Sequence, residues 1–334
     1  MVSAVIFVAT SCVSPLTGFA FWETNLAYEG ESIYNYLQVK NLSDRTILST
    51  NVLFGVQSVT MKDKGLTGMY YDTALAAPAL ADNANSALIL GMGTGTYARQ
   101  LKQYYPKMNI TGVEIDQKIT DLAGEYFDEP ADIPVTTYDG RAWLAASHDK
   151  YDVIMVDAYQ DITIPFQMSS TEFFTMVREH LNPGGVMVVN MNMISDGQGS
   201  INEALSDTIA SVFGNGNTLT ADVPNTTNRE LFAKKPGSGS EENSMQQASK
   251  ALNLRETTYE RTGSEDLEWY MEEAASRFRK VNEPDSASTI LTDDKAPVEV
   301  LGMHAIDQII ADEAGPYRQI LKDEGFGGLL RAVQ

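Results

Sequence analysis

One stretch, from Ser86 to Asp116, restricts the fold of this chain more than any other part of the sequence. Within it, the apolar segment Ala87–Leu90 runs into a glycine-rich loop, and a helix-like segment then continues to about Tyr105. A second apolar segment, Ile110–Val113, is followed by an acidic residue. This order predicts a strand, a loop, a helix and a second strand that form one parallel β-α-β unit.

The loop of this unit carries three glycines at alternate positions, Gly91, Gly93 and Gly95. Glycines let a backbone approach a cofactor closely, and an acid about 20 residues further on can bind both hydroxyls of a ribose. Glu114 stands at the end of the second strand and supplies such an acid. NAD-binding folds share the pattern, and a tight turn without a ligand also uses glycines. The neighbouring motifs must therefore decide between these alternatives.

Helical and apolar segments continue to alternate after Glu114. We expect helices over residues 117–127 and 171–180, and strands over residues 135–138, 151–156 and 186–190. Apolar strands that alternate with helices predict an α/β fold with a doubly wound parallel sheet. Two further acids, Asp139 and Asp157, follow strands of this set. Because such sheets bind ligands at the carboxyl ends of their strands, we expect these acids to lie together at the binding edge.

The chain divides into four parts by pattern. Residues 23–65 hold short β-like segments and predict a small antiparallel β unit, and residues 66–235 form the nucleoside-binding domain. Residues 236–334 begin with a linker rich in Gly and Ser and continue as an acidic helical extension. Residues 1–22 contain no charged side chain. A membrane segment, a signal peptide and a buried N-terminal element are the three alternatives for them.

Composition excludes several classes of partner. The formal charge is −21, from 45 acidic and 24 basic residues, which argues against nucleic acid and favours a small cationic substrate. Cys12 is the only cysteine, so no internal disulfide forms, and the three histidines are scattered. We therefore expect no metal. The paired acids near residues 292–299 fit a helix cap or turn better than a metal site.

Taken together, these motifs resemble the spermidine synthase (polyamine aminopropyltransferase) family over roughly residues 30–235. The resemblance rests on the glycine loop, on Val113-Glu114-Ile115-Asp116, on Tyr138-Asp139-Gly140 and on Val156-Asp157. It is closest to a divergent branch fused to membrane transporter-like segments, in which a DAY…IPF…EFF stretch and a late TDDxAPVE recur. That kinship would make residues 1–22 the end of a membrane segment.

The resemblance implies a sheet of the S-adenosylmethionine-dependent methyltransferase type and a set of site residues. It implies that Asp157 is the catalytic acid that orients the attacking amine or receives its proton. The implied cofactor-binding residues are Gly91, Gly93, Gly95, Glu114, Asp139, Gly140 and Asn35. The implied substrate-binding residues are Tyr70, Asp72 and Asp161.

The chain also departs from the family pattern. Thr94 stands where the family has an acid that binds the aminopropyl amine, Gln160 replaces a second acid, and a late tyrosine is missing after Pro224. Losing an anionic partner for an ammonium group costs ~1.5–3 kcal/mol, or roughly tenfold to hundredfold in affinity. The nucleoside site is therefore better supported than the aminopropyl chemistry.

Three functions follow from these observations. The first is a transferase of polyamine biosynthesis that moves the aminopropyl group of decarboxylated S-adenosylmethionine to an amine acceptor. The second is a methyltransferase that uses S-adenosylmethionine itself, which Thr94 favours. The third is a non-catalytic domain that binds a nucleoside or polyamine and is tied to a membrane protein. We expect a cytoplasmic protein, with membrane association through residues 1–22 and homodimer formation as open alternatives.

Overall fold

The computed structural model describes residues 23, 25–51, 56–128, 130, 132–158, 164–191, 199–214, 216–237, 245–246, 249–303 and 322. Residues 1–22, expected to include a membrane segment, and Asp161, expected to bind the substrate, lie outside the described residues. Within the described ranges, no helix is long and apolar enough to cross a membrane.

The main sheet has eight strands in the order β12-β10-β11-β9-β8-β5-β6-β7. The strands are β5 (Ser86–Leu90), β6 (Asn109–Glu114), β7 (Val135–Thr137), β8 (Tyr151–Val156), β9 (Leu181–Met191), β10 (Thr218–Asp222), β11 (Arg229–Lys234) and β12 (Phe278–Lys280). The five strands from β9 to β7 are parallel, and β11, β10 and β12 extend the sheet antiparallel. The predicted doubly wound parallel α/β sheet is confirmed, with an antiparallel extension that was not predicted.

Strand β8 shows why the central strands read as uninterrupted apolar runs. All six of its residues are buried, because helices cover the sheet on both faces. Val153 and Met155 contribute to the core on one face, while Ile154 and Val156 contribute to the core on the other. The alternation of side chains along a strand thus fixes which residues face each helical layer.

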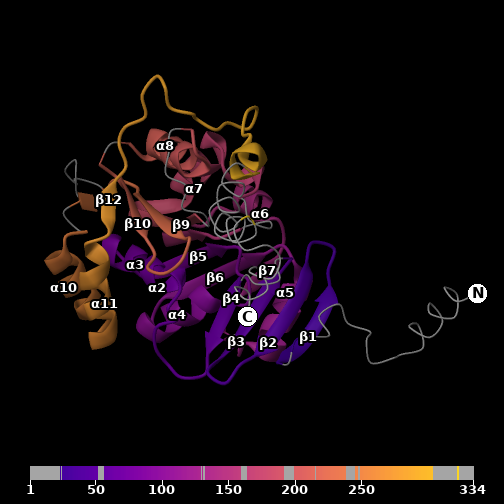
Figure 1. Cartoon of the computed structure of the whole chain (residues 1–334). Helices are drawn as coiled ribbons and strands as arrows, with labels where there is room; N and C mark the ends of the chain where they lie inside the picture. The colour runs from indigo at the N-terminus through magenta and orange to yellow at the C-terminus, as the bar shows by residue number, and fades with distance from the viewer. Residues whose placement is uncertain are drawn as a thin grey trace, which may run out of the picture.

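Two helical layers enclose the sheet (Figure 1). One layer contains α2 (Tyr70–Ala74), α3 (Ala76–Leu80), α4 (Thr96–Tyr104), α10 (Ala251–Thr262) and α11 (Glu265–Ala275). The other contains α6 (Gly140–Ala146), the short 3-10 helix η2 (Phe166–Met168), α7 (Thr171–His180) and α8 (Ile201–Phe213). Asp157, at the carboxyl end of β8, is partly exposed, and ligands of such sheets bind at this edge.

A separate four-stranded antiparallel sheet precedes the main fold, as predicted. It consists of β1 (Leu26–Glu31), β2 (Tyr36–Asn41), β3 (Arg45–Thr50) and β4 (Ser58–Met61) in sequential order. Helix α5 (Gln117–Tyr126) packs against it, since the two elements share one small core. The members of that core are Leu37, Val39, Leu48, Ile119, Leu122 and Phe127. The small sheet is thereby held beside β6 and β7, which α5 also contacts.

The C-terminal extension shares the core of the main domain. Leu254, Leu267 and Met271 are fully buried in the same hydrophobic cluster as strands β5 and β8. Strand β12 pairs with β10 at the edge of the main sheet. The expected boundary near residue 236 therefore separates two stretches of sequence that fold around one core.

Asp152 joins the amino ends of three strands. Its carboxylate, which is 5% exposed, accepts hydrogen bonds from the Asn85 amide and from Asn182 Nδ2, both at 2.8 Å. We predict that Asp152→Ala lowers the free energy of unfolding by roughly 1–3 kcal/mol, because two donors lose their acceptor in a buried place. Urea denaturation measures this change. Asp149→Ala, at an exposed position three residues away, is the control, and an equal loss in both variants would contradict the assignment.

Candidate active site

The glycine loop forms where β5 ends, and it passes very close to the end of β8. Gly91 has a φ of +88°, and a Cβ atom placed there would lie 2.4 Å from the Asp157 carbonyl oxygen. No side chain fits in that space, so glycine is required. The Asp157 amide donates to the Leu90 carbonyl at 2.9 Å, which continues the β5–β8 ladder up to this point. The loop and Asp157 are therefore built on one junction.

Glu114 closes strand β6 beneath the loop. Its side chain accepts hydrogen bonds from the Gly93 amide at 2.8 Å and from the Asp116 amide at 3.0 Å. The residue is only 6% exposed, and burial raises the pKa of its carboxyl group although both amide bonds oppose that shift. Glu114 thus lies against the loop glycines, where the sequence predicted an acid for a ribose.

Asp116 connects this edge to the small antiparallel sheet. Its Oδ2 accepts from Ser32 Oγ at 2.5 Å and from Asn35 Nδ2 at 3.0 Å, and its Oδ1 accepts from the Lys118 amide at the start of α5. Asn35, which we predicted to bind the cofactor, is therefore bonded to Asp116, the residue two positions after Glu114 in the chain. The Asp116 side chain is the bridge, and its role was not predicted.

Asp157 sits at the end of β8 with two partners. Tyr70 Oη donates to its Oδ2 at 2.7 Å, and Asn190 Nδ2 donates to its Oδ1 at 2.9 Å. Burial is the main cause that raises the pKa of Asp157 from 3.8 to about 7, and the negative charge of Glu114 adds to the shift. The two hydrogen bonds act in the opposite direction. A carboxyl group that titrates near neutral pH can accept or release a proton during a reaction.

A chain of hydroxyl groups continues from Asp157 into the protein. Tyr70 Oη lies 2.6 Å from Tyr71 Oη, and Tyr71 donates to the Gln57 carbonyl at 2.8 Å. Two tyrosine protons cannot satisfy all three oxygen–oxygen contacts from Asp157 to Gln57, because each hydroxyl donates once. A proton on Asp157 completes the chain. This arrangement agrees with a raised Asp157 pKa and gives both protonation states a defined set of partners.

Asp139 and Gly140 lie at the start of α6. The Asp139 carboxylate accepts from the Ala142 amide at 2.7 Å and caps the helix. The next residue, Arg141, forms a two-pronged ion pair with Asp293, with nitrogen–oxygen distances of 2.8 and 2.6 Å. Asp293 belongs to the late acidic stretch, so that stretch ties the C-terminal segment to the helix that carries Asp139. No group of acids, histidines or cysteines in the described ranges has metal-binding geometry.

Other predicted residues take different positions. The Asp72 carboxylate, 1% exposed, accepts from the amides of Thr67 and Gly68 and from the Thr67 hydroxyl, so it holds its own turn. Asp72 thus stabilises its own turn, and its expected polyamine contact stays a prediction. Thr94 is fully buried, and its hydroxyl has no hydrogen-bond partner within the described structure.

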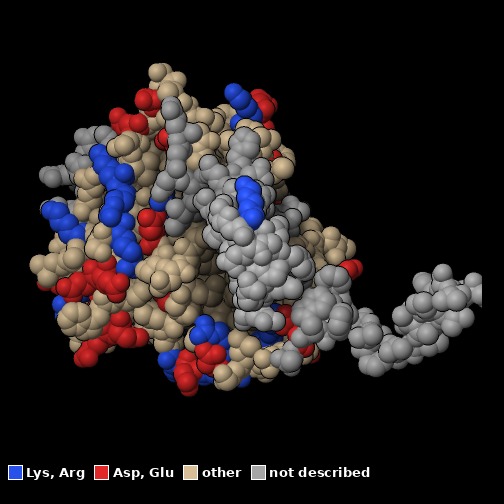
Figure 2. Space-filling model, in the orientation of Figure 1, with Lys and Arg blue, Asp and Glu red and all other residues tan. Residues whose placement is uncertain are grey.

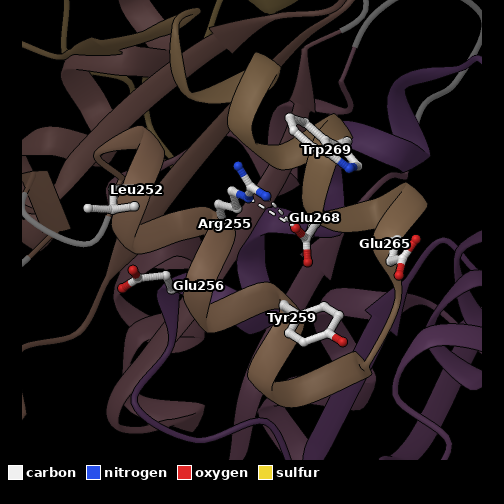
Figure 3. Close-up of a pocket in the computed structure, with 7 residues that line it drawn as sticks. All are labelled: Leu252, Arg255, Glu256, Tyr259, Glu265, Glu268 and Trp269. Atoms are coloured by element: carbon white, nitrogen blue, oxygen red, sulfur yellow. Dashed lines mark hydrogen bonds and ion pairs between the residues drawn. The ribbon is translucent and has the colours of Figure 1, made fainter.

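The surface also has a hollow away from these residues. It lies between α10 and α11, measures about 560 Å³, and is drawn in Figure 3. Arg255 there bonds Glu268 and lies over the ring of Trp269, with 4.1 Å between the guanidinium carbon and the ring centre. On the face in Figure 2, acidic side chains gather over these two helices. None of the predicted site residues lines this hollow.

Known proteins provide a comparison for this arrangement. Residues 69–235 match the family described as spermine/spermidine synthase domain. A protein of Bifidobacterium longum named "Probable polyamine aminopropyl transferase" is 99% identical over the whole chain, which spans 75% of that relative. A polyamine aminopropyltransferase of Corynebacterium efficiens is 37% identical over 36% of the chain and 25% of its own length.

Two solved structures share the fold. A probable spermidine synthase from Corynebacterium glutamicum superposes with a TM-score of 0.56 at 20% identity, covering 78% of this chain and 98% of that one. A spermidine synthase in complex with the transition state analogue AdoDATO gives a TM-score of 0.53 at 18% identity, covering 64% and 75%. Fold and site thus define a methyltransferase-like α/β protein with a glycine loop and strand-end acids. More narrowly, the chain belongs to the spermine/spermidine synthase family.

The raised pKa of Asp157 has a consequence for stability. Between pH 3.8 and about 7 the folded protein keeps this proton longer than the unfolded chain does, so this group's contribution is full below that window and is lost as the pH rises through it. We predict that Asp157→Asn removes this part of the pH dependence. Urea midpoints of wild type and variant at about pH 4 and pH 8 measure it. Parallel slopes in the two proteins would contradict the prediction.

Proposed function

We propose that this protein transfers the aminopropyl group of decarboxylated S-adenosylmethionine to an amine acceptor. Family membership and the names of its relatives support the reaction class. The observation that carries the proposal is the placement of Asp157, which titrates near neutral pH directly beside the glycine loop. A nucleoside bound on the loop would bring its sulfonium group to this carboxyl.

The donor would be held at the β5–β6 side of the edge. We assign the loop glycines and Glu114 to the ribose, and Asp139 with Gly140 to the adenine. Glu114 supports this assignment because the bonds from the Gly93 and Asp116 amides orient its carboxylate. Asn35 would act through Asp116, to which its side chain is bonded, and would fix the small sheet beside the nucleoside.

The chemistry requires a neutral amine. The acceptor nitrogen displaces the thioether at the carbon next to the sulfonium; a carbon–nitrogen bond forms, the carbon–sulfur bond breaks, and a proton leaves the nitrogen. Asp157 would accept that proton, with Tyr70 and Asn190 holding its two oxygens in place. Alignment of the nitrogen with the sulfonium supplies the rest of the acceleration.

The direct test mixes the protein with a diamine and either decarboxylated S-adenosylmethionine or S-adenosylmethionine. Chromatography then identifies the nucleoside product. Methylthioadenosine from the decarboxylated donor supports the proposal. S-adenosylhomocysteine from the ordinary donor would instead establish a methyltransferase. Binding of either donor without any product would establish a binding domain.

Asp157 should control the rate. We predict that Asp157→Asn lowers kcat by about 10²–10⁴ while nucleoside affinity stays nearly unchanged, because other residues hold the nucleoside. In wild type, kcat should rise with pH up to about 7, since only the ionised carboxylate accepts a proton. Asp149→Asn, an exposed change of equal charge, is the control. A variant that keeps both the wild-type kcat and this pH dependence would refute the role of Asp157.

Thr94 should control the choice of donor. Its neutral, buried hydroxyl occupies the place where the family resemblance expects an acid for the aminopropyl amine. We predict that Thr94→Asp increases the preference for decarboxylated S-adenosylmethionine over S-adenosylmethionine by roughly tenfold or more, because a carboxylate attracts the amine and repels the donor carboxylate. Calorimetric affinities for both donors measure the ratio. Thr94→Asn is the uncharged control, and an unchanged ratio in Thr94→Asp would contradict the assignment.

A further inference from the structure

Glu230, on strand β11, is a buried acid for which the fold offers no partner. The residue is 0% exposed, and neither carboxylate oxygen has a hydrogen-bond partner within the described structure. Buried polar groups are nearly always paired, and an unpaired buried acid is costly to the fold. An acid kept in such a position calls for a functional explanation.

The register of the sheet places Glu230 in a row with Asp157. Val156 of β8 lies beside Val189 of β9, so Asp157 and Asn190 follow as neighbours at the ends of this pairing. Asn190 in turn stands directly opposite Glu230 of β11. Residues opposite each other in an antiparallel pair project from the same face of the sheet. Asp157, Asn190 and Glu230 therefore form one row across three strands.

The two acids differ in depth. Asp157 is half-buried, whereas Glu230 is fully buried, so the Glu230 end of the row lies deeper in the protein. Asn190 lies between them and donates to Asp157 Oδ1 at 2.9 Å, while its own Oδ1 accepts from Asn228 Nδ2 at 2.9 Å. Both carboxyl groups interact electrostatically, since the charge on Asp157 raises the pKa of Glu230.

The strand order shows which residues lie on each side of Asp157. The glycine loop and Glu114 belong to β5 and β6, on one side of β8, while Asn190 and Glu230 belong to β9 and β11, on the other. A donor held at β5 and β6 reaches Asp157 from the first side. An acceptor whose nitrogen lies at Asp157 would then extend toward Glu230 on the second side.

We propose that Glu230 binds the far ammonium group of a short diamine acceptor whose attacking nitrogen lies at Asp157. This inference rests on the proposed function and adds a specificity-determining residue to it. Two strand spacings separate the backbones of the two acids by about 10 Å, a separation on the scale of a short diamine with a hydrogen bond at each end. The ammonium group supplies the hydrogen-bond donors that both Glu230 oxygens lack.

Binding should release a proton. Burial and the charge on Asp157 raise the pKa of the Glu230 carboxyl well above its ordinary value, so the empty site holds it protonated. Among the described residues, the Tyr97 phenol of α4 also interacts with Glu230, and its own pKa lies well above the ordinary value for tyrosine, so it stays neutral. When an ammonium group binds, the nitrogen keeps its proton, Glu230 becomes a carboxylate, and the proton of Glu230 passes to solvent.

The experiment compares wild type with Glu230→Gln, using 1,4-diaminobutane and the monoamine of equal chain length as probes. We expect the ratio of kcat/KM for diamine over monoamine to fall about tenfold or more in the variant, since a charge-assisted contact is lost. Affinity for methylthioadenosine should not change. Glu260→Gln removes an exposed acid of α10 and serves as the control of equal charge change.

Calorimetry of diamine binding separates this inference from the proposed function. Measured in two buffers of different ionisation enthalpy, wild type should release close to one proton more than Glu230→Gln does. Equal affinity and equal proton release in the two proteins would overturn the role of Glu230, even where wild type transfers the aminopropyl group. Absence of transfer by wild type, with weaker diamine binding by Glu230→Gln, would overturn the enzymatic function and support the role of Glu230.

Glu230→Leu tests the same point through stability. Because the carboxyl has no hydrogen-bond partner among the described residues, an apolar side chain should leave the melting temperature unchanged or higher while diamine binding is lost. A marked fall in melting temperature would show that Glu230 serves the fold, and would contradict the proposal.

Discussion

The close approach of two backbones, at Gly91 and Asp157, is the constraint on which the carboxyl edge of this protein depends. No atom of a side chain fits between them, because a Cβ on Gly91 would overlap the Asp157 carbonyl. Strands β5 and β8 therefore end side by side. The glycine loop begins after β5, directly beside Asp157, which follows β8. The nucleoside loop and the proton-accepting group proposed here are set in one rigid unit, so their relative position does not depend on flexible side chains.

Much of this edge could be predicted from sequence, because parallel strands that are buried on both faces leave uninterrupted apolar runs such as Val153–Val156. The acids that follow those runs could be placed at the carboxyl ends of strands for the same reason. Strand β1 was missed because its sequence, LAYEGE, has no regular alternation of apolar and polar residues. Strand β12 was missed because it is short and pairs only through a distant part of the chain.

Contacts between side chains on neighbouring strands could not be predicted from the sequence. Asn190 ends an apolar strand without any motif, and only the register shows that it bonds Asp157 and stands opposite Glu230. Asp72 is a second example, since the sequence does not show that its two oxygens accept hydrogen bonds within its own turn. Burial explains the electrostatics that follow, since it is the main cause that raises the pKa of Glu114, Asp157 and Glu230 alike.

The ion pair between Arg141 and Asp293 connects two regions that are separated by half the chain. Arg141 lies in the first turn of α6, immediately after the Asp139–Gly140 pair, and Asp293 also accepts from Ser170 at the start of α7. The segment around Asp293 is therefore held against the first turns of α6 and α7. If a ligand binds more tightly when the first turn of α6 is ordered, reciprocity requires that the ligand and the docking of the segment around Asp293 strengthen each other by the same free energy.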